Sequence, residues 1–143
     1  MTPFERAVRA EIYRQFAGGE VDVGAAELAR ARAWDRHEVE RALESLQAQH
    51  RISLAPGSHQ VAMAHPFAGI DTGYRAHIDS GSWFANCAWD ALAIVALLGH
   101  GDGRASGRKG DIDWMVEDGL VSPTGLVHLL VPARHFWDDI GFT

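Results

Sequence analysis

The 143-residue sequence contains a single cysteine, Cys87, and no long apolar run. One thiol excludes an internal disulfide and a structural zinc site made mostly of thiolates, so Cys87 serves either packing or chemistry. No stretch reaches the roughly 18 apolar residues of a transmembrane helix. Residues 1–14 form a charged amphipathic pattern that lacks the apolar centre of a signal peptide. We therefore expect a cytoplasmic protein without a membrane partner.

Basic residues are outnumbered, with 13 Lys and Arg against 19 Asp and Glu, which gives a formal net charge of -6. This balance disfavours a surface built to bind phosphate backbones or anionic lipid. The hydrophobic fraction of 47% and the charged fraction of 22% are ordinary for a folded globular protein. The length suffices for one compact domain, or for a small module fused to a modest core.

Several catalytic signatures are also missing. The eight histidines include no HExxH and no close pairing with Cys87, which disfavours a zinc hydrolase. The serines form no nucleophile elbow, and the glycine-rich stretch 99–110 lacks the spacing of a phosphate-binding loop. We expect the histidines to be surface or core residues, including His65 and His77, which flank the region of Cys87.

The first 64 residues predict three helices followed by two strands. The predicted helices cover residues 4–16, 25–33 and 35–49, and the predicted strands cover residues 51–55 and 59–64. Gly18 and Gly19 end the first helix, and Asp35 is the predicted N-cap of the third, with Glu38 at the capping-box spacing. This order is typical of a winged helix-turn-helix. The third helix carries four acidic residues against two arginines, however, so nucleic acid is not an expected partner and a packing role is favoured.

At His65-Pro66 the sequence changes to a stretch interrupted by proline and glycine residues. We therefore place a module boundary near residue 64, which divides the chain into modules 1–64 and 65–143. The second module predicts a strand at 74–78, a buried helix at 83–98 ended by Gly99, a polar loop at 101–110, and strands at 112–117 and 125–131. The expected fold class is α+β. A winged-helix-like three-helix module packs on a small mixed α/β core that has a buried cysteine-bearing helix.

Cys87 and Asp90 lie three residues apart near the start of this predicted helix, on one face. A cysteine in the first turn is expected to have a lowered pKa because of the helix dipole. Ala91, Ile94 and Leu98 share the face, and such burial raises the pKa of a carboxyl group. A thiolate beside a protonatable carboxyl suits capture of a soft metal centre and protonation of a leaving carbon. The alternative is that Cys87 packs as a small hydrophobe and Asp90 compensates the helix dipole.

Two segments resemble the organomercurial (alkylmercury) lyase family, residues 65–77 (HPFAGIDTGYRAH) and residues 83–92 (WFANCAWDAL). In that family a short strand leads into a helix with a Cys-Ala-x-Asp motif. The resemblance implies that Cys87 takes mercury from the organomercurial and that Asp90 protonates the departing carbanion, giving a hydrocarbon and mercuric ion. Both residues would contact mercury as substrate or product, and no cofactor is implied. Asn86, Trp89 and Phe67 are candidates to shape the pocket.

The family uses a second cysteine on a late strand, and no residue here matches it. The sequence ends at Thr143, about where that strand would reach its cysteine, so we expect the core to be incomplete at its C-terminus. Because mercuric ion prefers two thiolate ligands, low-molecular-weight thiols are expected partners beside the small organomercurial or other soft-metal ligand.

Three readings of the resemblance stay open: a truncated or degenerate lyase, a lyase helped by external thiol or a second chain, and a non-catalytic soft-metal or ligand-binding relative. Two further classes are a single-cysteine winged-helix transcription regulator and an inactive partner subunit. The regulator would bind DNA with an affinity that falls steeply with salt. The inactive subunit would associate tightly with another protein and leave organomercurials unchanged.

Overall fold

The structure, a computed structural model, describes residues 1–107, 113–124 and 131–138. Its helices are α1 (Pro3–Ala17), α2 (Ala25–Arg32), α3 (Arg36–Ala48) and α4 (Ala88–Leu98), with a short 3-10 turn at Ala133–His135. Its strands are β1 (Ser53–Leu54), β2 (Val61–Ala64), β3 (Phe67–Ala68), β4 (Tyr74–Ile78), β5 (Gly81–Ala85), β6 (Gly103–Ser106), β7 (Asp113–Glu117) and β8 (Leu120–Ser122). The predicted α+β class is confirmed.

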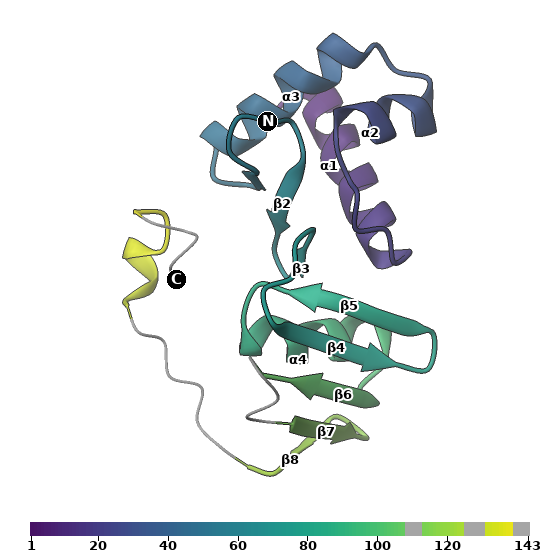
Figure 1. Ribbon diagram of the computed structural model, residues 1–143, viewed down its shortest axis with the longest axis vertical. Coiled ribbons are helices and arrows are strands. Elements are labelled where there is room, and N and C mark those ends of the chain that lie inside the picture. Colours follow the sequence, from purple (N-terminus) through teal and green to yellow (C-terminus); the bar gives the residue numbers. More distant parts are fainter. Residues whose placement is uncertain (108–112, 125–130, 139–143) are drawn as a thin grey trace.

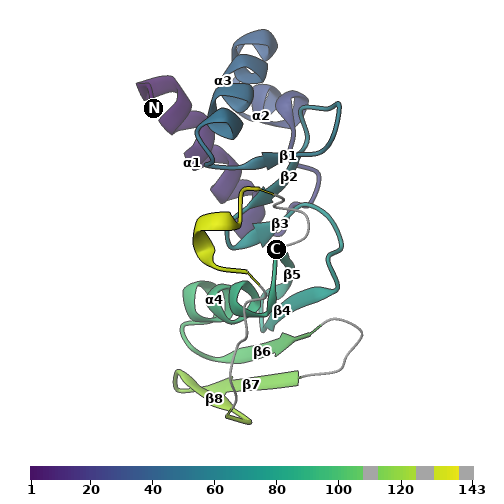
Figure 2. The same ribbon diagram turned by 90° about the vertical axis from the view of Figure 1, so that its left-hand side faces the viewer.

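The eight strands form one sheet in the order β1-β2-β3-β5-β4-β6-β7-β8, and every neighbouring pair is antiparallel. Helices α1 to α3 gather at one end of the molecule, next to β1 and β2 (Figure 1 and Figure 2). Helix α4 packs against β4, β5 and β6 (Figure 2). The sheet therefore links the helical end to the layer that carries Cys87.

Local signals explain why the first three helices form where the sequence predicts them. Thr2 and Glu5 make a reciprocal capping box at the start of α1, and Gly18 ends that helix. The predicted N-cap Asp35 accepts a hydrogen bond of 2.9 Å from the backbone N–H of Glu38. The observed helices match the predicted ranges within two residues. The order of three helices and a two-stranded hairpin is also observed, while the boundary near residue 64 stays a prediction.

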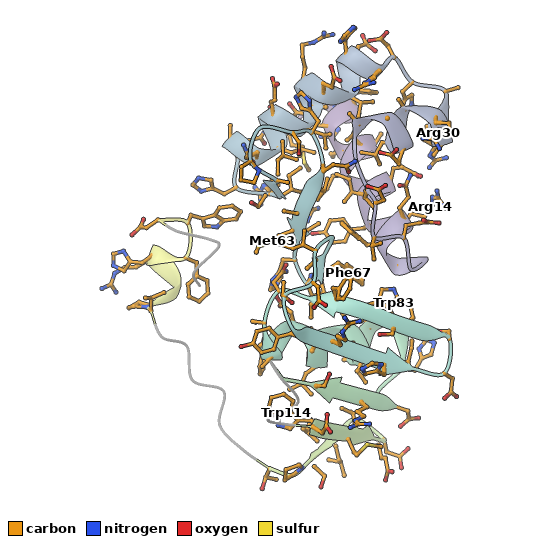
Figure 3. All side chains as sticks on the ribbon, in the orientation of Figure 1. Arg14, Arg30, Met63, Phe67, Trp83 and Trp114 are labelled. Atoms are coloured by element: carbon orange, nitrogen blue, oxygen red, sulfur yellow. The ribbon has the colours of Figure 1, made fainter. Side chains whose placement is uncertain are left out.

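Helix α1 is joined to the sheet beyond β2 by aromatic contacts. The Phe16 ring stacks on the Phe67 ring of β3, with centroids 6.0 Å apart and planes 13° from parallel. The indole Nε1–H of Trp83, on β5, donates to the backbone carbonyl of Phe16 at 2.8 Å. Phe67 and Trp83 both lie where the helical end meets the larger part of the sheet (Figure 3). Burial of these rings ties the two predicted modules together.

The predicted helix at 83–98 is wrong in its first part, because residues 83–85 belong to β5. Ala76 on β4 pairs with Trp83, and Tyr74 pairs with Ala85. Trp83 and Ala85 are buried while Phe84 between them is only half-buried, which is the alternation of a strand. A short apolar run does not distinguish a strand from a buried helix by periodicity alone. The predicted end of the helix at Gly99 is confirmed.

The predicted loop at 101–110 is also wrong, because it contains β6, a central strand between β4 and β7. Gly103 has φ +153°, and a Cβ atom there would lie 2.6 Å from the carbonyl oxygen of His77. Glycine is thus present because the strands approach closely, and it also weakens the sequence signal for a strand. The predicted strand at 112–117 is observed as β7, and β8 was not predicted. Residues 125–130 of the last predicted strand lie outside the described residues.

Among the described residues, no helix combines the length and the apolar character needed to cross a membrane.

Candidate active site

The candidate site lies where β5 passes into α4. Strand β5 ends at Ala85, and Cys87 is the N-cap of α4 with extended backbone (φ -151°, ψ -179°). The Cys87 carbonyl accepts the first helical hydrogen bond, from the N–H of Ala91 at 3.0 Å. Asp90 is therefore the third residue of the helix. Cys87 and Asp90 thus have the spacing of an N-cap and the third helical residue, whose side chains face each other. Cys87 precedes the first turn of the helix and does not lie in it.

Asp90 is buried as predicted, with only 2% of its surface exposed, beside the fully buried Ala91 and Ile94. Cys87 is half-buried. The Oδ1 atom of Asp90 is inaccessible to solvent and has no hydrogen-bond partner among the described residues. Nearly all buried carboxylate oxygens are hydrogen-bonded, so a polar neighbour close to this oxygen is expected.

The pKa of the Cys87 thiol is raised, mainly by burial. The backbone N–H groups of Asp90 and Trp89 lower it, whereas the charge and the hydrogen bond of the Asp90 carboxylate raise it further. The predicted lowering of this pKa is therefore wrong, because desolvation outweighs the helix N-terminus. Cys87 therefore rests as a thiol beside the Asp90 carboxylate.

His65 joins the pair from a distant part of the sequence. Its Nδ1 atom lies 3.0 Å from Asp90 Oδ1, while its side chain is 73% exposed. The two atoms are within ion-pair distance, although the ring is not aligned for a hydrogen bond. The contact with Asp90 raises the pKa of His65. His65 was expected to be a surface or core residue without a role in the site, and its contact with Asp90 was not predicted.

The other predicted pocket residues are placed differently. Asn86 lies directly before Cys87, with its Oδ1 atom buried and without a hydrogen-bond partner in the part of the chain that is described. Trp89 is 60% exposed at the start of α4. Phe67 is buried against Phe16, so it belongs to the junction with α1. His77 lies on β4 opposite Ser82 and Arg104, where burial lowers its pKa.

The described residues contain no group of three or more His, Cys, Asp or Glu side chains arranged to hold a metal ion. The site therefore presents one thiol and one carboxylate, with an imidazole behind the carboxylate. Such a set can bind a thiophilic centre at sulfur and move a proton to or from the adjacent atom.

The fold and this thiol-carboxylate pair define an α+β protein with a half-buried cysteine at a helix N-terminus. No protein-family model matches the sequence, and no curated protein matches it. The fold is similar to that of the mercury-bound form of MerB2, with a TM-score of 0.65 and 18% sequence identity over 85% of this chain and 60% of that chain. The chain thus spans less than two thirds of the length of that protein, and at this identity the likeness shows a shared fold.

Proposed function

We propose that the protein cleaves carbon–mercury bonds by protonolysis, with Cys87 as the mercury-binding thiol and Asp90 as the proton donor to carbon. The observation that carries the proposal is the buried Asp90 carboxylate beside the Cys87 thiol. The likeness in fold to a mercury-bound protein supports mercury as the metal that this site takes.

The first step is transfer of mercury to the protein. The substrate is an organomercurial bound to a small thiolate, R–Hg–SR′. The Cys87 thiol gives its proton to the Asp90 carboxylate while its sulfur bonds to mercury and R′S⁻ leaves. Because the raised pKa keeps Cys87 protonated, its proton must leave as mercury binds, and the adjacent Asp90 carboxylate is placed to take it.

The second step breaks the carbon–mercury bond. The proton on Asp90 passes to the carbon, the bonding electron pair stays with carbon, and RH leaves. The external thiolate R′S⁻ takes the free position on mercury, so mercuric ion is held by Cys87 and R′S. A second small thiol then protonates and frees Cys87 and releases Hg(SR′)₂. External thiol supplies the second sulfur ligand because the chain has one cysteine.

The test is headspace detection of hydrocarbon from methylmercury or phenylmercury in excess small-molecule thiol. The chain is compared with Cys87→Ser, Asp90→Asn and, as a matched control, Asp79→Asn at an exposed position. We expect release that is lost in the first two variants and unchanged in the third, since removing a general acid typically lowers a rate by about 10²- to 10⁴-fold. Release no faster than the thiol-only control would contradict the proposal.

A second candidate function is soft-metal binding without cleavage, which the single cysteine favours. Intact-mass detection of a mercury adduct and quenching of Trp89 fluorescence report binding in either case, so hydrocarbon release separates the two candidates. A binding protein forms the adduct through Cys87 and releases no hydrocarbon. Trp89→Phe identifies the quenched tryptophan, because Trp89 lies two residues from the thiol and is exposed.

A further inference from the structure

An exposed histidine contacts the buried carboxylate of the site from outside. His65 Nδ1 lies 3.0 Å from Asp90 Oδ1, with the histidine 73% and the aspartate 2% exposed. A bare imidazole lone pair would repel a carboxylate oxygen at this distance, so Nδ1 carries the hydrogen. His65 is the only side chain within ion-pair distance of Asp90 among the described residues.

The backbone around His65 is fixed on both sides. The Tyr13 hydroxyl on α1 donates to the His65 carbonyl at 2.9 Å. The Asn86 N–H donates to the carbonyl of the buried Pro66 at 3.4 Å, which ties this segment to the turn that carries Cys87. Residue 64, directly before His65, pairs with residue 67 between β2 and β3. The histidine therefore approaches Asp90 from a segment held by α1 and by the site itself.

We propose that His65 is a positioning residue for Asp90: its Nδ1–H holds Oδ1, so that the other carboxylate oxygen stays directed to the reacting centre. This inference rests on the proposed function and adds a third residue to it. An ion pair between two exposed groups contributes little to the position of either group. This pair differs because Asp90 Oδ1 is buried and has no other hydrogen-bond partner in the described part of the chain. Loss of the imidazole would leave that carboxylate free to rotate away from carbon.

The kinetic test compares His65→Ala with His65→Asn, whose Nδ2–H lies near the position of the histidine Nδ1–H. The control is His37→Ala, which removes another exposed histidine, with Nδ1 2.9 Å from Glu40. We expect the alanine variant to lower kcat for hydrocarbon release by about 10- to 100-fold with little change in KM, since misplacement of a reacting group costs up to about 10²-fold. The asparagine variant should recover most of the loss, and the control should match the unmodified protein.

A second measurement does not depend on turnover. In protein labelled with carboxyl-¹³C aspartate, the Asp90 resonance is identified by its loss in Asp90→Asn. We expect it to shift in His65→Ala and to return towards its original position in His65→Asn, at one fixed pH. An alanine variant with unchanged kcat, or one with an unmoved resonance, would overturn the inference, as would an asparagine variant as slow as alanine.

The two measurements separate the inference from the proposed function. If the unmodified chain releases no hydrocarbon, the proposed function fails, and the Asp90 resonance alone decides whether His65 holds the carboxylate. If the chain releases hydrocarbon and the alanine variant is equally fast, the proposed function stands and the role of His65 fails.

Discussion

At Cys87, two opposing effects act on one thiol. A helix N-terminus stabilises a nearby negative charge by about 0.3–1 kcal/mol, which is less than one pKa unit. Burial can shift a pKa by several units in the other direction. Because Cys87 is half-buried and faces the Asp90 carboxylate, burial prevails and the pKa rises. Sequence spacing located the thiol at the helix start but carried no information on its burial.

The raised pKa of Cys87 predicts slow alkylation at neutral pH. Iodoacetamide should modify the thiol with a rate that rises to a midpoint above about 8.5, the pKa of an unperturbed cysteine. Asp90→Asn should lower that midpoint, because it removes the carboxylate charge and hydrogen bond that raise it. Intact-mass spectrometry over a pH series measures both rates. A midpoint clearly below 8.5 in the unmodified chain would show that the helix N-terminus dominates after all.

Between elements, a buried carboxylate joins α1 to α2. Glu11 on α1 is fully buried, and its Oε2 atom accepts hydrogen bonds of 2.8 Å from both Arg14 and Arg32. Gln15 donates to its other oxygen at 3.0 Å. The hydrogen bond from Arg14 is the main reason that the pKa of Glu11 is lowered to about 2. Arg32 ends α2, so this network fixes the angle between the two helices.

Replacing Glu11 by glutamine should lower the free energy of unfolding by about 1–3 kcal/mol at pH 7. A carboxylate with a lowered folded pKa stabilises the protein above its unfolded pKa, near 4.5, and that contribution disappears as the pH falls through about 2. The difference between Glu11→Gln and the unmodified chain should therefore vanish near pH 2. Chemical denaturation at several pH values measures it.

The matched control for Glu11 is Asp71→Asn, which breaks an exposed ion pair with Arg75. We expect a change below about 0.5 kcal/mol, because solvent screens such pairs. An equal loss in both variants, or a Glu11→Gln difference that does not depend on pH, would contradict the role given to the buried network.

Elements were predictable where a local signal decides them. The glycine pair at 18–19 and the N-cap Asp35 define helix ends within a few residues, and α1 to α3 follow. Strands β5 and β6 depend on partners distant in sequence. Trp83 belongs to a strand because it pairs with β4. Gly103 can belong to β6 because only glycine fits against the His77 carbonyl. Neither condition can be read from a window of neighbouring residues.

The candidate site likewise has a part that the sequence predicts and a part that depends on distant pairing. Cys87 and Asp90 are three residues apart and could be paired from helical geometry alone. His65 is far from both in sequence, and its contact with Asp90 depends on how β3 lies beside β5. No spacing pattern joins a histidine before one strand to an aspartate in a later helix. Its one sequence signal was its position at the start of the segment that resembles the lyase family.

On the scale of the whole molecule, the sheet does not stop at the predicted boundary. Strands β2 and β3 pair across residue 65, and Phe16 of α1 is buried against Phe67 beyond it. The larger part of the sheet thus supplies apolar contacts on which the end of α1 depends. Stability should accordingly be shared between residues 1–64 and the rest of the chain.

This continuity predicts one unfolding transition. Circular dichroism reports mainly on α1 to α3, which hold most helical residues, and fluorescence reports on tryptophans that include the buried Trp83. The two probes should give coincident denaturant curves, as in a two-state protein.

Phe67→Ala should move both curves together by about 3 kcal/mol, because a buried phenyl ring is lost from both sides of the junction. Leu120→Ala, at a 76% exposed position on β8, should leave them nearly unchanged. Helical signal that persists after the fluorescence change would contradict this prediction. It would identify residues 1–64 as a module that unfolds independently of the rest of the chain.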